Sequence, residues 1–175
     1  YRTGRLLFGN PALERAIIDN VDLRWEWYPT AEEAVSVAGF YKHFDAPIEN
    51  IVAVSAVSGS VGTFDNATAA TNLGIEADVR KGLGFIGRAL RDFSIAGNVA
   101  FIYSRVDLSD TGGNQTSSIR PLQGQSPYVA NIQLGYENER SRTSGTLLYN
   151  VFGPRIVEVG TYGIPDTFEL PVHRV

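Results

Sequence analysis

Strict alternation of apolar and charged side chains marks residues 21–27, where the even positions are Asp22, Arg24 and Glu26. A β-strand turns successive side chains to opposite faces, so this run predicts a strand with one apolar and one charged face. Residues 73–80 repeat the pattern, with charges at Glu76, Asp78 and Arg80. Residues 128–137 follow it less strictly. Period two is therefore the dominant signal in the chain.

The rest of the chain extends this pattern into an array of strands. Three further stretches, residues 34–54, 93–106 and 143–159, favour strands with less regular faces, and residues 168–175 look like the start of another. We therefore expect seven strands, six of them whole. Short connections (29–33, 82–92 and 138–142) alternate with longer polar ones (54–66, 107–126 and 160–167). This alternation predicts an up-and-down array with one plain end and one elaborated end. Helical spacing is confined to residues 11–18, too short for a stable helix.

Composition narrows the possible classes of protein. The 175 residues favour a single domain, and charged residues make up only 19%, below the roughly 25% that is typical of soluble domains. The net charge of −4 argues against a nucleic-acid partner. Cysteine is absent, which excludes disulfides, thiolate zinc sites and a cysteine nucleophile. Methionine is also absent and the chain begins at Tyr1, so we expect a piece of a longer protein.

Alternation alone does not separate a soluble β-sandwich from a transmembrane β-barrel, but the aromatic residues do. In a membrane barrel, aromatic side chains gather at the two headgroup levels. Here they lie near the short-turn ends (Trp25, Trp27, Tyr28, Phe93, Tyr136) and near the long-loop ends (Tyr103, Tyr128, Phe152). Residues 93–106 and 127–138 also reach the roughly 9–11 residues of a tilted membrane strand. The pattern favours a membrane barrel, whose missing strands must come from a longer chain, because lipid cannot satisfy an open sheet edge.

Two motifs with chemical associations are better explained as structure. Gly82, Gly84 and Gly87 have the spacing of a dinucleotide-binding fingerprint, but only residues 88–92 precede the next strand, too few for the required helix. We interpret this segment as a glycine-rich turn with Phe85 and Ile86 at the membrane interface. The two histidines are far apart and no cysteine accompanies them, which argues against a metal site. We expect no cofactor and no enzyme activity.

Several ordered motifs resemble TonB-dependent outer-membrane receptors. They are RPLQGQSPYVAN at residues 120–131, LGYEN at 134–138, GNPAL at 9–13 leading into NVDLRWE at 20–26, FYK at 40–42, PIE at 47–49 and GIPDTFE at 163–169. The resemblance implies an all-β, antiparallel, up-and-down transmembrane β-barrel of 22 strands around an N-terminal plug. Residues 1–175 would supply about seven strands of that single barrel domain, without the plug and the last strands. The short turns would then face the periplasm and the long loops the exterior.

The resemblance also implies a function and a set of partners. Such receptors lie in the lipid of the bacterial outer membrane and import a scarce nutrient, with a siderophore-, cobalamin- or glycan-like ligand. TonB energises them through an N-terminal region that this sequence does not contain. Two alternatives stay open: a soluble β-rich binding or adhesion domain, and an outer-membrane barrel of another type, such as a plugless porin. None of these readings involves nucleic acid.

The same framework assigns candidate roles to residues. The charged positions Asp22, Arg24, Glu26, Glu76, Asp78 and Arg80 would line the lumen, pair across strands and contact the plug. Within this set we expect Arg24 and Arg80 to bond plug carboxylates. Weaker candidates for ligand contact lie in the long loops at Asn114, Gln115, Arg120 and Gln123.

Overall fold

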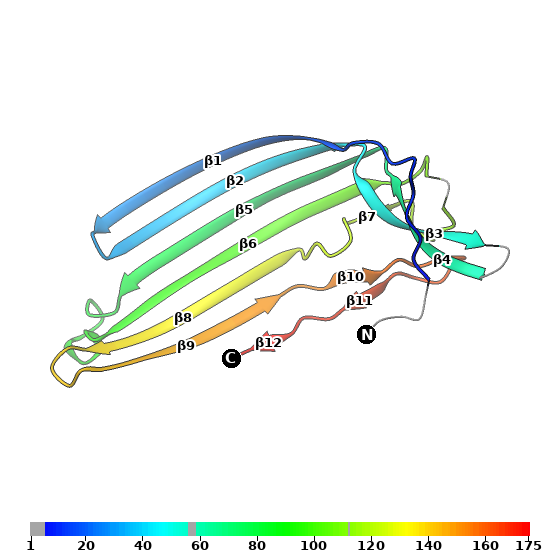
Figure 1. The fold of residues 1–175 in the computed structure, drawn as a ribbon. Helices are drawn as coiled ribbons and strands as arrows, with labels where there is room; N and C mark the ends of the chain where they lie inside the picture. The colour runs from blue at the N-terminus through cyan, green and yellow to red at the C-terminus, as the bar shows by residue number, and fades with distance from the viewer. Residues whose placement is uncertain (1–5, 56–58, 112) are drawn as a thin grey trace.

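Six long antiparallel strands form one curved sheet in the computed structural model of the chain, which describes residues 6–55, 59–111 and 113–175 (Figure 1). They are β1 (Ile17–Thr30), β2 (Glu33–Asp45), β5 (Ala69–Gly82), β6 (Phe93–Asp107), β8 (Tyr128–Asn138) and β9 (Thr143–Phe152). Each is 10 to 15 residues long, enough for a tilted strand to cross a bilayer. The short strand β12 (His173–Arg174) adds to β9, and β7 (Ile119–Arg120) pairs with β6.

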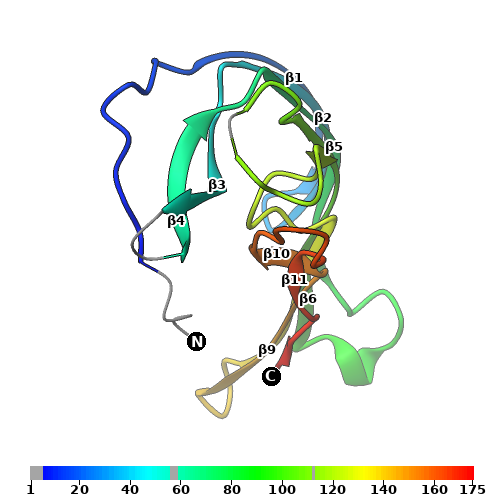
Figure 2. The ribbon, with the colours of Figure 1, turned by 90° about the vertical axis from the view of Figure 1, so that its right-hand side faces the viewer.

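The strand register separates the sheet into two faces of opposite character. Leu23 lies opposite Gly39, Gly39 opposite Ile75, and Ile75 opposite Phe101, so apolar positions of neighbouring strands share one face. We call this the outer face. Leu23 is 79% exposed and Ile75 is 52% exposed. Such exposure of apolar side chains is unfavourable in water but not among acyl chains. The other face, which we call the inner face, lies on the concave side of the sheet, and the long loops fold over it (Figure 2).

These positions confirm the prediction of a barrel wall over that of a sandwich. A sandwich would bury Trp25, Leu73 and Ile132 together, but they are 57%, 51% and 45% exposed on the outer face. The sheet curves without closing, and within the described residues no strand pairs with the free edge of β1. The chain therefore has the shape of a barrel segment.

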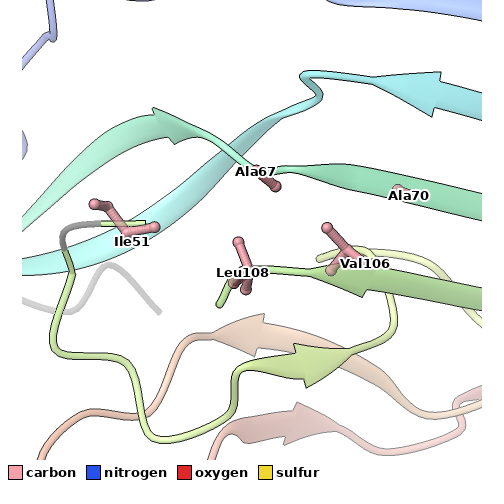
Figure 3. Packing of buried hydrophobic residues seen from close by; sticks show 5 residues of the cluster. All are labelled: Ile51, Ala67, Ala70, Val106 and Leu108. Atoms are coloured by element: carbon pink, nitrogen blue, oxygen red, sulfur yellow. The ribbon is translucent and has the colours of Figure 1, made fainter. Parts of the chain in front are cut away.

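A second structural unit sits against the inner face at the end of the sheet opposite the short turns. It contains the hairpin of β3 (Ile48–Ser55) and β4 (Gly59–Asn66), the pair β10 (Arg155–Glu158) and β11 (Thr167–Glu169), and the connections around them. We call residues 46–55, 59–68, 108–111, 113–127 and 153–169 the loop layer. Its core joins Ile51, Ala67 and Leu108 to the inner-face residues Ala70 and Val106 (Figure 3).

The expected strand at 34–54 is wrong in its extent, and so is the expected loop at 54–66. The strand β2 ends at Asp45, because Ala46 adopts a positive φ of 51° and Pro47 offers no backbone N–H to continue the ladder. The chain then forms the β3–β4 hairpin, which pairs with itself and leaves the main sheet.

The expected strands at 143–159 and 168–175 also need correction. Gly153 and Pro154 end β9, and the residues beyond it form β10, which pairs with β11 in a separate sheet. Pro171 separates β11 from β12, and only β12 returns to the main sheet. The segment 11–18 forms no helix, and its last two residues begin β1.

The aromatic belts are confirmed for most, but not all, of their predicted members. Phe93 and Tyr136 share a register position on the outer face, with ring centroids 4.9 Å apart. Tyr28, in contrast, donates its hydroxyl to Glu26 on the inner side. Phe152 lies opposite Val129 at an inner-face position, and its ring packs against the Arg155 guanidinium at 4.5 Å. These two aromatics belong to the lumen side, because strand parity fixes their direction.

Candidate functional site on the inner face

A continuous row of polar side chains crosses the inner face, one from each paired strand. Register partners link its members in order: Glu26, Ser36, Asp78, Asn98, Asn131, Asn150 and Arg174. Such a row follows the hydrogen-bonding direction of the sheet, so neighbouring side chains are close enough to bond across strands. The row borders a hollow of about 650 Å³ on the concave side.

The part of the row on β1, β2 and β5 is an ion-pair network organised by Arg24. Its guanidinium donates to Glu26 at 2.6 Å and to Ser36 Oγ at 2.9 Å, and it lies 3.5 Å from Asp78 Oδ2. Ser36 Oγ also donates to Asp78 at 2.9 Å. The alternation of β1 places Arg24 and Glu26 side by side, and the register brings Ser36 and Asp78 to them. Both carboxylates therefore have their counter-charge within the wall.

The part of the row on β6, β8 and β9 is a ladder of neutral amides. Asn150 Nδ2 donates to Asn131 Oδ1 at 2.6 Å, and Asn131 Nδ2 donates to Asn98 Oδ1 at 2.8 Å. Each asparagine has two donor hydrogens and two acceptor lone pairs, so the ladder leaves hydrogen-bonding capacity directed at the lumen. Sequence reasoning missed these residues. Asn131 has the polar parity of its strand, which is the one signal that could have found it.

The structure divides the six predicted lumen residues between two places. Arg24, Glu26, Asp78 and Arg80 line the larger hollow. Asp22 and Glu76 line a smaller one of about 360 Å³, which Gln125 of the loop layer also borders. Arg80 is exposed, and within the described part of the chain its guanidinium makes no ion pair or hydrogen bond. It is thus the cation of this group that is available to a partner.

The four residues predicted to contact a ligand all lie in the loop layer, where they make the following contacts. Arg120 forms a buried ion pair with Glu49 at 2.9 Å, the two side chains being 2% and 8% exposed. Gln123 donates to the Val157 carbonyl at 2.9 Å, which ties the 108–127 connection to β10. Gln115 bonds Thr111 within its own loop. Of the four, Asn114 alone is exposed, and its backbone bridges Val52 and Thr161.

The electrostatics of the Arg120–Glu49 pair reflect its burial. Removal from water raises the pKa of the Glu49 carboxyl, while the Arg120 guanidinium and the Gln123 backbone N–H act in the opposite direction without cancelling the rise. The Arg120 guanidinium also donates to the carbonyls of Pro121 and Asn50 at 3.0 and 3.3 Å. One arginine therefore joins β7 to the β3–β4 hairpin.

Among residues 6–55, 59–111 and 113–175, no group of three or more His, Asp or Glu side chains is arranged to hold a metal ion. No helix in these ranges combines the length and the apolar character needed to span a membrane.

Comparison with known proteins identifies the wall. A sequence model described as "TonB dependent receptor-like, beta-barrel" matches residues 1–169. The chain belongs to the TonB-dependent receptor β-barrel family. This family consists of outer-membrane receptors and transporters. An apolar outer face and a polar inner face are what a barrel of this family requires. No curated protein sequence matches the chain.

Two solved structures show the same fold as this TonB-dependent receptor segment. The copper transporter OprC superposes with a TM-score of 0.64 at 17% identity, covering 93% of this chain and 23% of that protein. The FrpB iron transporter from Neisseria meningitidis (F3-3 variant) superposes with a TM-score of 0.60 at 10% identity, covering 97% and 24%. The chain thus spans about a quarter of the length of either transporter.

Proposed function

We propose that the chain forms wall strands and extracellular loops of a TonB-dependent transporter in the bacterial outer membrane. The observation that supports this best is the opposite polarity of the two sheet faces, apolar where lipid would lie and ionic where the lumen would lie. The full receptor would import a scarce nutrient, of the siderophore-, cobalamin- or glycan-like classes, with TonB as the energy-coupling partner. The solved relatives carry copper and iron, so metal chelates are the first ligands to test.

Uptake by the full receptor tests this proposal. The receptor would be expressed in a Gram-negative host lacking its own uptake systems, and accumulation of radiolabelled ferric siderophores, copper, cobalamin and oligosaccharides would be measured with and without TonB. We expect TonB-dependent uptake of one ligand class, together with recovery of the receptor in the outer-membrane fraction. Uptake that is equal in the strain without TonB would instead support a passive porin. Recovery of the full receptor as a soluble protein would support the binding-domain alternative.

We also propose that the inner face holds the receptor's plug domain through Arg80. The supporting observation is the contrast within the predicted pair of arginines. Arg24 is occupied by Glu26, Ser36 and Asp78, whereas Arg80 has no such partner among the described residues. Arg24 then serves to keep its neighbouring carboxylates neutralised. The other lumen residues contribute surface that the plug lies against.

Charge reversal distinguishes the two arginines. Arg80→Glu should speed hydrogen exchange in the plug of the full receptor, because a carboxylate that Arg80 bonded now meets a like charge. Arg24→Glu serves as the matched control: it should alter exchange in β1, β2 and β5 first, because Arg24 bonds Glu26, Ser36 and Asp78 within the wall. Plug protection that is unchanged by Arg80→Glu would count against the contact, and it would leave the transport proposal standing.

A further inference from the structure

The three short turns of the sheet are not alike. The β1–β2 turn presents Ala31 and Glu32, and the β8–β9 turn at 139–142 reads Glu-Arg-Ser-Arg. The β5–β6 turn, residues 83–92, is longer and contains the short 3-10 helix η1 (Arg88–Leu90). Before this helix stand Phe85 and Ile86, 69% and 61% exposed, which we call the apolar tip. It stands outside the curve of the sheet, on the side of the outer face (Figure 2). Two large apolar side chains at this place call for an apolar contact.

The apolar tip is held in place by its surroundings. Leu83 N donates to the Phe93 carbonyl at 2.8 Å, which closes the base of the turn, and Ile86 N donates to the Leu83 carbonyl at 3.1 Å. The Lys81 ammonium lies 5.0 Å from the centre of the Phe85 ring and 3.2 Å from Glu33. Lys81 has outer-face parity, as the register partner of Ile95. The tip therefore continues the outer face beyond the end of the strands.

The same turn carries basic side chains next to its apolar tip. Residues 83–92 include Arg88 and Arg91 and one acidic residue, Asp92. Arg91 lies 3.3 Å from Asp92, whereas the exposed Arg88 guanidinium makes no ion pair or hydrogen bond among the described residues. Apolar side chains flanked by cations match the order of a membrane surface, where acyl chains lie beneath phosphates.

We propose that the β5–β6 turn is a phospholipid-binding site at the short-turn end of the barrel. Phe85 and Ile86 enter the acyl-chain boundary, and the Arg88 guanidinium binds the headgroup phosphate with its paired N–H donors. Lys81, whose charge is paired with Glu33, orients the tip through its contact with the Phe85 ring. The occupant is a membrane phospholipid, because the tip faces the same side as the lipid-facing strands. The proposal rests on the placement of the outer face in lipid.

Spin labels test the insertion of the tip. Single Cys substitutions would be made at Phe85, at Arg140 in the β8–β9 turn and at Ile75 on the outer face. The labelled full receptor would be placed in phosphatidylethanolamine–phosphatidylglycerol vesicles. We expect the label at 85 to be reached by oxygen and shielded from a water-soluble nickel chelate, as at 75, and the label at 140 to show the reverse. Chelate access at 85 with shielding at 75 would overturn this proposal alone; chelate access at 75 would remove the membrane wall itself.

Retained lipid tests the headgroup contact. After detergent exchange, phospholipid bound to the full receptor would be counted by native mass spectrometry. Loss of charge-assisted hydrogen bonds should weaken binding about tenfold in Arg88→Gln. Arg140→Gln, a matched change in a polar turn, should retain lipid as the wild type does. Equal retention in the two variants would overturn the phosphate contact, and saturation of the turn by a co-purified protein would show that its partner is not lipid.

Discussion

The six-strand sheet and the loop layer place apolar side chains in opposite environments. On the outer face, Leu23 and Phe101 are 79% and 57% exposed. In the loop layer, Val52, Leu108 and Ile156 are at most 2% exposed. Among the described residues, the apolar side chains of the outer face have no layer packed on them, while the loop layer buries its apolar residues as a soluble domain does.

This difference shows that two regions of one chain can place their apolar side chains for two different environments. Alternation in the long strands matches lipid outside and a wet lumen inside. In the proposed membrane placement the loop layer lies beyond the lipid, and its contacts are a small core and the buried Arg120–Glu49 pair. Charge should therefore matter in opposite ways: removing a charge should destabilise the loop layer, whereas adding one should destabilise the outer face.

Removal of Arg120 should produce the largest effect. Arg120→Ala leaves the buried Glu49 carboxylate without its counter-charge, which costs about 3–5 kcal/mol. Faster hydrogen exchange in β3, β4 and the 108–127 connection of the full receptor would measure this, with the long strands unaffected. Arg155→Ala is a matched control, because the Arg155–Glu169 pair is 39% and 32% exposed and should contribute below about 1 kcal/mol. Equal effects of the two substitutions would mean that the Arg120–Glu49 pair is not shielded from water.

A charge on the outer face should produce the next largest effect. Ile75→Arg should destabilise the full receptor in vesicles by about 2–4 kcal/mol, because the guanidinium would meet acyl chains. Gln133→Arg, which faces the lumen, should be nearly neutral. Urea unfolding followed by the shift in gel mobility of the folded barrel measures both. Similar losses in the two variants would contradict the assignment of the faces.

The sequence predicts the faces of the sheet well because parity is a local property. Arg24 and Glu26 are two residues apart on one strand, so their shared face follows from alternation alone. The end of β2 is different: Ala46 interrupts the strand through its backbone conformation, and the apolar residues on both sides of Pro47 hide the break.

The candidate site was predictable only in part, because its bonds cross between strands. The Asn98–Asn131–Asn150 ladder depends on the register of three strands, which no single segment encodes. The Arg120–Glu49 pair depends on the folding of the loop layer over the inner face. The position of Arg120 in a polar loop suggested a ligand contact, but its burial against Glu49 could not be read from that segment.

Interruption of the amide ladder should have a smaller effect. Asn131→Leu removes two side-chain hydrogen bonds of the inner face and should lower the free energy of unfolding by about 1 kcal/mol, since water in the lumen replaces part of the loss. Gln133→Leu is the control, because Gln133 is on the same face and strand and makes no side-chain hydrogen bond within the described ranges. Urea midpoints in vesicles compare the two. An equal shift in the urea midpoint would mean that the hydrogen bonds of the ladder add no stability beyond that of any polar side chain at this face.

The smallest expected effect is a pH dependence confined to the loop layer. Burial raises the pKa of Glu49 in the folded protein above its value in the unfolded chain, so the folded state binds the proton more tightly. The stabilisation is therefore complete below the ordinary glutamate pKa and is lost as the pH rises through the raised value. Mild acidification from neutral pH should slow hydrogen exchange in β3 and β4 relative to the long strands. Glu49→Gln, which cannot titrate, should remove that difference; a difference that persists would assign the effect to another group.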